Sequence, residues 1–541
     1  MEIDVLFENF DSLMDSPNST ARMRELILQL AVQGKLVDQD PNDEPASELL
    51  KRIKAEKEKL ISEGKIKKQK PLLPITEDEI PYELPDGWEA IRIGDAINMI
   101  NGRAFKPSEW NTVGVPIIRI QNLNNPVALY NYCDFDVASK FHLKDGDFLI
   151  SWSGTPGTSF GAFIWDRGPA VLNQHIFRCE LYGDSFFRPY LRLAIKAQLD
   201  EMISQAHGGV GLQHITKGKL EKLLVTLPPF AEQKRIVSKV DQLMHLCDQL
   251  DACQKKAATK YESLNDAALE KLLSSKTIDE FANHWQFLCD NFDLIYNDPA
   301  HVNKLRQAIL QIAVQGKLEP QDPNDEPASE LLKHIKTEKE KLIAEGKIKK
   351  QKPLPPITDD EIPYELPQGW EWSRLGKILT FEYGKGLTKQ QRNEKGNIPV
   401  YGSNGIVGYH DQYLLDSPCI IIGRKGSSGA LNICYTASWT TDVAYYCSPP
   451  KELDLEYIYI SLKFLELGRL GKGIKPGLNR NEVYVQILSI PPLSEQKRIV
   501  AKVDQLMNLC DELETRLNQS KKDSEMLMQA VLQEEFAIKQ A

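Results

Sequence analysis

Two stretches of the chain, residues 98–226 and 380–489, gather side chains that could bind a ligand through hydrogen bonds. In both, glycine-rich loops with Arg, Lys, Asn, Gln, Ser and Thr follow short aliphatic runs that are typical of strands. Arg and Lys match the edge of guanine, Asn and Gln match that of adenine, and glycine lets the backbone approach a phosphate. The loops therefore predict contacts to a nucleic acid.

The candidate residues in the first stretch lie in NGRAFK, at the end of the strand-like run VPIIRIQNL, and in three later loops. They are Lys106, Arg119, Gln121, Asn122, Ser153, Thr155, Gln174, His175, Gln213, His214 and Lys217. The candidates in the second stretch are Lys385, Lys389, Tyr401, Ser403, Asn404, Arg424, Lys425, Ser427, Ser428, Thr440, Thr441, Lys472, Lys475 and Asn479.

The expected roles of these residues differ. Phosphate and sugar take half to two-thirds of protein–DNA hydrogen bonds. Phosphate contact is therefore the role expected for Lys106, Arg424, Lys425, Lys472 and Lys475. Structural alternatives stay open: strand-edge charges for Arg119 and Arg178, core aromatics for Trp152 and Trp439, structural hydrogen bonds for His175 and His214, and plain turns for the glycine-rich loops.

The two stretches show little sequence similarity, yet their loops follow one order. SWSGTPG (151–157) parallels GRKGSSG (423–429), and NQHIF (173–177) parallels TTDVAYY (440–446). HGGVGLQHI and GKGIKPGL lie at the same distance before a Pro-Pro pair. We therefore expect the two stretches to share one fold.

Motifs for catalysis are missing from the sequence. It contains no NPPY or NPPF tetrapeptide of adenine methyltransferases and no GxxxxGK[ST] phosphate loop. His, Cys and Asp residues do not fall at metal-ligand spacings. We therefore expect a protein with no catalytic residues, no metal and no cofactor of its own.

Cysteine usage and hydropathy predict a compartment. The nine cysteines include no Cys-x-x-Cys pair, which argues against zinc and disulfides. No apolar run reaches the ~18 residues that span a membrane, and the acidic N-terminus lacks the basic region of a secretory signal. We expect a cytoplasmic protein with reduced thiols and no membrane contact.

A repeated scaffold surrounds the two stretches. Residues 39–89 and 321–371 are identical at 45 of 51 positions, at an offset of 282. PPFAEQKRIVSKVDQL (228–243) and PPLSEQKRIVAKVDQL (491–506) repeat at an offset of 263, so the first intervening stretch is 19 residues longer. Recent duplication alone explains the similarity but not the contrast. The pattern indicates scaffolds that face identical partners and variable units that face different targets.

The charge distribution fits this division. The net charge is -10, which alone would argue against nucleic-acid binding. Each variable stretch, however, carries two more Lys and Arg than Asp and Glu, so the remaining chain carries -14. The acidity belongs to the scaffold.

Apolar residues recur at alternating steps of four and three after each Pro-Pro pair. This predicts two helices of about forty residues, each ~60 Å long, with a coiled-coil seam. The seam positions are Ile236, Val240, Leu243, Cys247 and Leu250, and then Ile499, Val503, Leu506, Cys510 and Leu513. A plain bundle or a homodimerisation coil would show the same pattern, but two copies in one chain favour intramolecular antiparallel pairing.

A second repeated helix is predicted at residues 47–63 and 329–345, with a thin apolar stripe and many charges. Such a charge run is usually a solvated face. Because it is nearly identical in both copies, it is also a candidate surface for docking a partner.

The chain resembles the specificity subunits of type I restriction-modification systems. The doubled PPxxEQKRIV element carries this resemblance, together with LPDGWE and LPQGWE, which end at Glu89 and Glu371. IPVYGSNGIVGY (398–409) and IIIGRKGSSG (420–429) are also typical. The resemblance covers essentially the whole chain.

The resemblance implies two target recognition domains, each of which reads one half of a split, asymmetric double-stranded DNA target. It implies an antiparallel coiled coil that sets the gap between the halves. It also implies docking of two modification methyltransferase subunits, which bring S-adenosylmethionine, and of restriction subunits, which bring ATP-driven translocation and cleavage with Mg. The subunit itself would be non-catalytic.

We therefore predict an α+β protein in which two mixed α/β recognition domains are separated by long helices that pair as an intramolecular coiled coil, with pseudo-two-fold symmetry. The expected domains are an N-terminal scaffold (1–97), recognition domain 1 (98–226), a central scaffold (227–379), recognition domain 2 (380–489) and a C-terminal helix (490–541). A coiled-coil adaptor with two protein-binding heads and a self-contained methyltransferase or nuclease are the alternatives.

Overall fold

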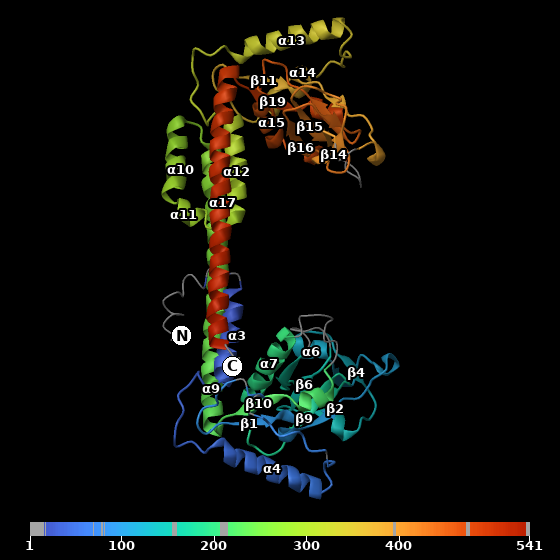
Figure 1. The fold of residues 1–541 in the computed structure, drawn as a ribbon, viewed down its shortest axis with the longest axis vertical. Coiled ribbons are helices and arrows are strands. Elements are labelled where there is room, and N and C mark those ends of the chain that lie inside the picture. The colour runs from blue at the N-terminus through green and yellow to red at the C-terminus, as the bar shows by residue number, and fades with distance from the viewer. Residues whose placement is uncertain are drawn as a thin grey trace. The chain divides into compact units, whose positions relative to one another are not determined.

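The structure is a computed structural model that describes residues 14, 16, 18–68, 70–76, 79–80, 82–153, 160–205, 215–392, 396–471 and 477–536. The chain divides into two compact units (Figure 1). Unit 1 comprises Met1–Lys256 with Lys521–Ala541, and unit 2 comprises Ala257–Ser520.

The strand-rich part of unit 1, which we call head 1 (residues 89–227), contains two four-stranded sheets. One has the antiparallel order β2 (Ile97–Asn101), β9 (Ile176–Leu181), β6 (Phe148–Ser151), β7 (Gly161–Ile164). The other has the order β4 (Asn131–Cys133), β3 (Val115–Ile118), β8 (Ala170–Leu172), β5 (His142–Leu143), with β3 and β8 parallel. Helices α5 (Ile93–Ala96), α6 (Ile120–Asn124), α7 (Arg188–Gln205) and α8 (Lys217–Glu221) complete it. Strand β1 (Glu89–Arg92) begins head 1 and strand β10 (Leu224–Leu227) ends it, and these two strands pair with each other.

Head 2 (residues 371–490) repeats this plan in unit 2. Its sheets have the orders β12 (Glu382–Tyr383), β18 (Ala444–Cys447), β15 (Cys419–Gly423), β16 (Leu431–Cys434), and β14 (Ile406–His410), β13 (Ile398–Tyr401), β17 (Trp439–Thr440). Strands β13 and β17 are parallel, as β3 and β8 are. Its helices are α14 (Leu375–Ile378), α15 (Leu455–Phe464) and α16 (Arg480–Tyr484), and β11 (Glu371–Arg374) pairs with β19 (Ile487–Ile490).

Equivalent backbone hydrogen bonds confirm that the heads share one fold. The N–H of Gly102 donates to the Ile176 carbonyl over 3.1 Å, and the N–H of Gly384 donates to the Ala444 carbonyl over 3.2 Å. A Cβ atom at either glycine would collide with the neighbouring backbone, so no larger residue fits without a shift of the chain. The expected common fold of the two variable stretches is thus explained by a common hydrogen-bond frame.

The two long predicted helices are present as α9 (Phe230–Ser274) and α17 (Leu493–Phe536). Their seam residues are buried or half-buried: Ile236, Val240, Leu243, Cys247 and Leu250 in α9, and Ile499, Val503, Leu506, Cys510 and Leu513 in α17. In unit 1, Leu250 of α9 and Met528 of α17 belong to one apolar cluster. In unit 2, Leu272 of α9 and Val503 of α17 belong to another.

A third helix shares the seam in each unit, which the heptad pattern did not predict. It is α3 (Ser19–Val32) in unit 1 and α12 (Pro299–Val314) in unit 2. In unit 1, Ile27 and Ala31 of α3 pack in one cluster with Ile236 and Val240 of α9. The pattern shows which face of a helix is apolar, but the number of helices that cover this face depends on residues elsewhere in the chain.

Ion pairs on these third helices repeat between the units. Arg24 of α3 binds Asp248 and Asp251 of α9, both at 2.7 Å. The equivalent Arg306 of α12 binds Asp511 of α17 at 2.6 Å and Glu514 at 2.7 Å. The roles of α9 and α17 are therefore exchanged between the two units.

The second repeated helix is also present, as α4 (Ala46–Ser62) and α13 (Ala328–Ala344). Leu49 and Ile53 of α4 and Leu331 and Ile335 of α13 are buried, while most of their charged residues are exposed. Helices α10 (Ile278–Asp290) and α11 (Phe292–Ile295) connect α9 to α12.

The run VPIIRIQNL is not one strand, contrary to the sequence-based expectation. Strand β3 ends at Ile118, and helix α6 begins at Ile120. The Asn122 side chain accepts a hydrogen bond from the Arg119 N–H at 3.1 Å and donates to the carbonyls of Ala128 and Leu129. A side chain that satisfies backbone groups in this way favours a turn over continuation of the strand.

Three further features concern the cysteines, possible metal sites and possible membrane-spanning helices. All nine cysteines are free thiols. Within the described ranges, no group of three or more His, Cys, Asp and Glu residues is placed to hold a metal ion. Helices in the described part of the chain are all too short or too polar to cross a membrane.

Candidate nucleic-acid interface

In head 2, two of the predicted loops meet at the C-terminal end of strand β15. Residues 402–405 lie against residues 423–429, because a Cβ atom at Gly423 would collide with the carbonyls of Ser403 and Ser427. Gly426 lies beside the Ser403 hydroxyl: a Cβ atom added at Gly426 would be 3.6 Å from that oxygen. The contacts bring together predicted residues from two separate segments and leave backbone groups near the surface.

A third segment of head 2, around residues 440–442, is hydrogen-bonded to Lys385 and Tyr401. The N–H of Lys385 donates to the Thr440 carbonyl at 2.9 Å, and the Thr441 hydroxyl donates to the Tyr401 carbonyl at 2.9 Å. Thr440, Thr441 and Tyr401 are buried, whereas Lys385 is exposed. The buried residues therefore hold the loops, and the lysine is presented by them.

Arg424 is half-buried, and its guanidinium is bound to the protein. Its guanidinium donates to the Asp442 carbonyl at 2.8 and 3.2 Å. It lies 5.3 Å from the ring centre of Tyr383, and Arg480 lies 5.0 Å from the same ring. Tyr383 is 48% exposed. The result is a cationic surface with an accessible aromatic ring, two features that favour phosphate and base contacts.

The equivalent position of Lys385 in head 1 is Arg103, which sequence analysis missed. The N–H of Arg103 donates to the Leu172 carbonyl at 2.9 Å, as Lys385 does to Thr440. Its guanidinium lies 4.6 Å from the ring centre of Phe105 and 4.9 Å from that of Phe135. One Nη atom binds Glu109, and the other has no hydrogen-bond partner among the described residues. NGRAFK contains Arg103, and alignment of Gly102 with Gly384 would have identified it.

Predicted residues on the loop after β8 lie beside Trp152. The His175 ring centre is 5.5 Å from that of Trp152, and the Gln174 amide contacts the His175 Nε2 at 3.2 Å. The Trp152 N–H donates to the His175 carbonyl at 3.3 Å, just as the Arg424 N–H donates to the Val443 carbonyl at 2.9 Å in head 2. Trp152 and Arg424 thus occupy equivalent positions with different chemistry.

The candidates around α6 separate into exposed and buried residues. Arg119 is half-buried and lies 5.1 Å from the ring centre of Trp110, which is 39% exposed. Gln121 is exposed, whereas Asn122 is completely buried. Ser153 is also buried. Asn122 and Ser153 therefore lie behind the surface, and the Asn122 side chain shapes its loop through its hydrogen bonds.

The remaining candidates differ in their exposure and in their contacts. Lys106, Lys389, Asn404, Lys425 and Ser427 are exposed, and Ser403 and Ser428 are half-buried. Lys217 donates to the Met99 carbonyl at 2.9 Å, and Asn479 caps helix α16 through the Asn481 N–H. Thr155, Gln213, His214, Lys472 and Lys475 lie outside the described residues.

Other polar groups that sequence analysis missed lie near these loops in head 2. Arg392 Nε, His410 Nδ1 and Asn432 Nδ2 are buried atoms without a hydrogen-bond partner among the described residues. Asn432 Oδ1 is 3.9 Å from the virtual Cβ of Gly405, at the edge of the 402–405 loop. Spacing could not have identified these groups, because they come from three separate segments of the chain.

Comparison with known proteins identifies the class. The model of the type I restriction modification DNA specificity domain matches residues 85–260 and 367–520. The EcoAI specificity subunit of Escherichia coli is 36% identical over 91% of this chain and 90% of its own length. The EcoEI specificity subunit of Escherichia coli is 33% identical over 92% of this chain and 90% of its own.

The chain belongs to the family of type I restriction enzyme specificity subunits. It is therefore a non-catalytic subunit that provides DNA sequence recognition through two domains. Among solved structures, the HsdS subunit from Thermoanaerobacter tengcongensis aligns with 84% of this chain and 98% of its own length, at 16% identity and a TM-score of 0.46. The family assignment rests on the sequence matches.

Proposed function

We propose that the chain reads a bipartite, asymmetric double-stranded DNA target, with head 1 on one half and head 2 on the other. The observation that carries the proposal is the shared frame with different side chains on it. Arg103 stands where Lys385 stands, and Trp152 stands where Arg424 stands. One fold with exchanged surface residues is what two readers of different sequences require.

The proposed DNA contacts are all residues of the predicted set except the five that are buried. Phosphate contacts fall to Lys106, Arg424, Lys425, Lys472 and Lys475, and to Arg103 in addition. Base or phosphate contacts fall to Arg119, Gln121, Thr155, Gln174, His175, Gln213, His214, Lys217, Lys385, Lys389, Ser403, Asn404, Ser427, Ser428 and Asn479. The buried Asn122, Ser153, Tyr401, Thr440 and Thr441 hold the loops that present them.

The scaffold is proposed to dock two copies of a modification methyltransferase subunit and the restriction subunits. S-adenosylmethionine, ATP and Mg would then be held by these partners, in the cytoplasm. The near identity of α4 and α13, together with the exchanged ion pairs of α9 and α17, supports one docking surface for a modification subunit in each unit. The lengths of α9 and α17 would set the gap between the half-sites.

The proposed domain boundaries follow the strand pairs that flank each head. β1 pairs with β10, and β11 pairs with β19. These pairs support recognition domains at residues 98–226 and 380–489, scaffold at 1–97 and 227–379, and a C-terminal helix at 490–541.

A selection from random-sequence duplexes tests this function. The full chain, copurified with its modification subunit, is bound to the library at several salt concentrations, and the retained DNA is sequenced. We expect enrichment of one sequence in two separated parts and binding that weakens steeply with salt. Binding of the modification subunit without any enrichment of DNA sequence would instead support the adaptor with two protein-binding heads.

A further inference from the structure

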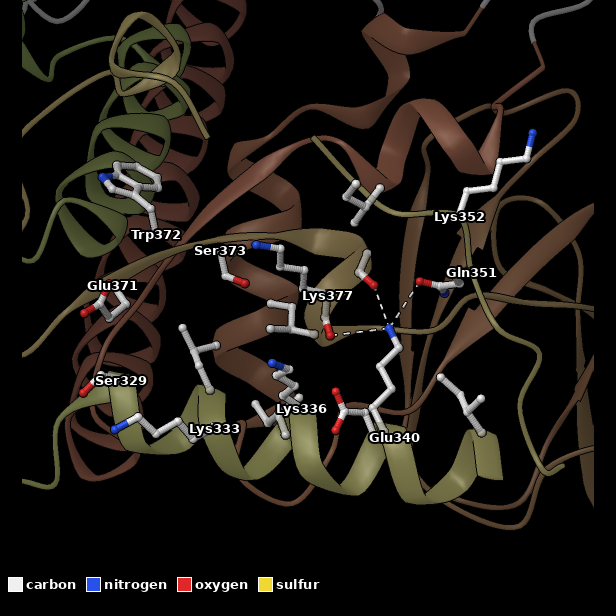
Figure 2. A pocket seen from close by; sticks show the side chains of 17 residues that line it. Ser329, Lys333, Lys336, Glu340, Gln351, Lys352, Glu371, Trp372, Ser373 and Lys377 are labelled. Atoms are coloured by element: carbon white, nitrogen blue, oxygen red, sulfur yellow. Dashed lines mark hydrogen bonds between the residues drawn. The ribbon is translucent and has the colours of Figure 1, made fainter. Parts of the chain in front are cut away.

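Unit 2 contains a groove between helix α13 and head 2 whose lining includes none of the proposed DNA contacts. Its cavity volume is about 620 Å³. One wall is α13 from Ser329 to Ile343, and the other is formed by β11, α14 and the segment around Gln351 (Figure 2). The α13 wall spans fourteen residue steps, or ~21 Å at 1.5 Å per residue. A groove of this length fits an extended or helical segment better than a compact small molecule.

The groove is cationic. It is lined by five lysines and two glutamates, which are Lys333, Lys336, Lys339, Lys352 and Lys377 with Glu340 and Glu371. Lys336 comes from α13 and Lys377 from α14, so exposed lysines lie on opposite walls of the groove (Figure 2). The floor also has apolar residues, among them Ile335, Leu354 and Ile378.

Lys339 is the half-buried lysine of this groove, and no carboxylate among the described residues binds it. The Lys339 ammonium donates to the Gly376 carbonyl at 2.6 Å, to Gln351 Oε1 at 3.3 Å and to the Lys377 carbonyl at 3.4 Å. In the part of the chain that the structure describes, no acidic group pairs with it. Burial lowers the pKa of Lys339.

The first scaffold copy provides the comparison. Lys57 is the equivalent of Lys339, and it donates to the Gly94 carbonyl at 3.1 Å, but it also binds Asp95 at 2.7 Å. Asp95 occupies the position of Lys377. The lining residues of the second copy sum to a charge of +3, whereas their sequence equivalents in the first copy, with four lysines, Glu58, Glu89 and Asp95, sum to +1. The four lysines of the repeated segment are the same in both copies. The charge around them differs because head 1 contributes Asp95 where head 2 contributes Lys377.

We propose that the groove between α13 and head 2 is a docking site for an acidic, partly apolar segment of a partner protein subunit, and that the first copy lacks an equivalent site. The lysines on both walls would pair with carboxylates, and the apolar floor would take the aliphatic side chains between them. A DNA backbone has no aliphatic side chains that would pack against this apolar floor. This inference rests on the proposed function, because it assumes that the chain works as a subunit of a complex.

The consequence is an inequality between two scaffold copies that are otherwise nearly identical. A partner with a single acidic segment would engage the second copy and not the first. The determinant is residue 377 and its counterpart at 95, which belong to the heads and not to the repeated segment.

Reciprocal charge exchange tests the proposal. The probe is a fluorescein-labelled synthetic helical peptide of glutamate and leucine, bound to the full chain and followed by fluorescence anisotropy. We expect one site in the natural protein and a loss of affinity of about tenfold or more in Lys377→Asp, because the exchange reverses one charge and supplies a counter-ion for Lys339. Asp95→Lys should raise the stoichiometry from one peptide to two. Lys451→Asp, an equal charge change at an exposed lysine away from the groove, should leave the peptide affinity within about twofold.

Two results would overturn the inference: no binding of the peptide, or equal binding by the natural protein and Lys377→Asp. Competition by inorganic pyrophosphate as strong as that by unlabelled peptide would assign the groove to phosphate instead. Selection of DNA by Lys377→Asp is measured in parallel, because the proposed function predicts unchanged sequence enrichment. Failure of the peptide arm alone rejects the groove, and failure of the DNA arm in the natural protein rejects the proposed function.

Discussion

Trp88 Nε1 donates a hydrogen bond to Glu232 Oε2 at 3.0 Å, and Trp370 Nε1 donates to Glu495 Oε2 at the same distance. Each bond joins the last residues of the first repeated segment to the start of a long helix. Gln39 and Gln321 complete the pattern by donating to the other carboxylate oxygen, at 3.2 and 3.1 Å. Both glutamates are buried, and burial raises the pKa of each carboxyl. The GWE and PPxxEQ motifs are therefore parts of one contact.

Trp88→Phe should destabilise unit 1 around this contact. The change keeps an aromatic ring but removes the donor to a buried carboxylate, a loss of about 1.5–3 kcal/mol. Hydrogen exchange measured by mass spectrometry should show faster exchange in β1 and in the first turns of α9. Trp370→Phe is the matched control and should affect β11 and α17 instead. Uniform change throughout the chain, or none, would contradict this role.

Glu361→Gln should lower thermal stability in a pH-dependent manner. Hydrogen bonds from Arg374 lower the pKa of Glu361 from 4.5 to about 2, with help from the Thr358 N–H. Because the folded pKa lies below the unfolded one, the ionised carboxylate stabilises the fold above pH 4.5, and this contribution is lost as the pH falls toward 2. The difference in melting temperature should therefore be full at pH 7 and vanish in acid.

Calorimetry from pH 7 down to the acid limit measures this difference. Glu365→Gln changes an exposed carboxylate that has no ion pair among the described residues, and its difference from the natural protein should stay small at every pH. Glu79→Gln should behave like Glu361→Gln, because Arg92 likewise lowers the pKa of Glu79. A difference for Glu361→Gln that grows in acid would contradict the assignment.

Arg103→Ala should weaken DNA binding by head 1, and Lys385→Ala should weaken DNA binding by head 2. If each side chain neutralises one phosphate, each substitution lowers the slope of log K against log salt by about 1. Titration of target duplex at four or more salt concentrations gives the slope. Asn122→Ala should behave differently. It removes a buried loop contact and so alters the fold of head 1, but it removes no charge and should leave the slope unchanged. An unchanged slope in both cation variants would remove these residues from the interface.

Insertion of one heptad into both long helices should lengthen the unread gap. Seven residues placed between Gln254 and Leu264 and between Leu517 and Leu527 preserve the seam and add ~10 Å to each helix. That corresponds to about three base pairs at ~3.4 Å each. Sequencing of methylated sites should show the same half-sites at a wider spacing. An unchanged gap would show that the helices do not set it.

Local patterns were sufficient to predict the scaffold. Helices α4 and α13 begin one residue before the predicted spans. Helices α9 and α17 have 45 and 44 residues, somewhat more than the predicted length of about forty. These predictions came close because a heptad pattern and a helix-breaking proline depend only on residues that are near in sequence. Helices α3 and α12 were missed as partners of the seam. Which helix covers an apolar face is decided by tertiary contacts, such as Arg24 with Asp248, which join segments more than two hundred residues apart.

The candidate interface was predictable in its loops and less so in its individual residues. The order of the glycine-rich loops correctly indicated one fold, because Gly102 and Gly384 serve the same close approach of two strands. Exposure was not predictable: Gln121 faces solvent, and its neighbour Asn122 is buried by bonds to Ala128 and Leu129. Arg103 was passed over for Lys106 in the same motif, since only the strand register shows which of them matches Lys385.

Exchange of one head tests the central claim most directly. Residues 98–226 are replaced by the corresponding stretch of a relative with a different target, the modification subunit is coexpressed, and methylated sites are sequenced in the cells. Each head is proposed to read one half-site, so exactly one half of the target should change, with the other half and the gap retained. A change in both halves, or in neither, would contradict the account.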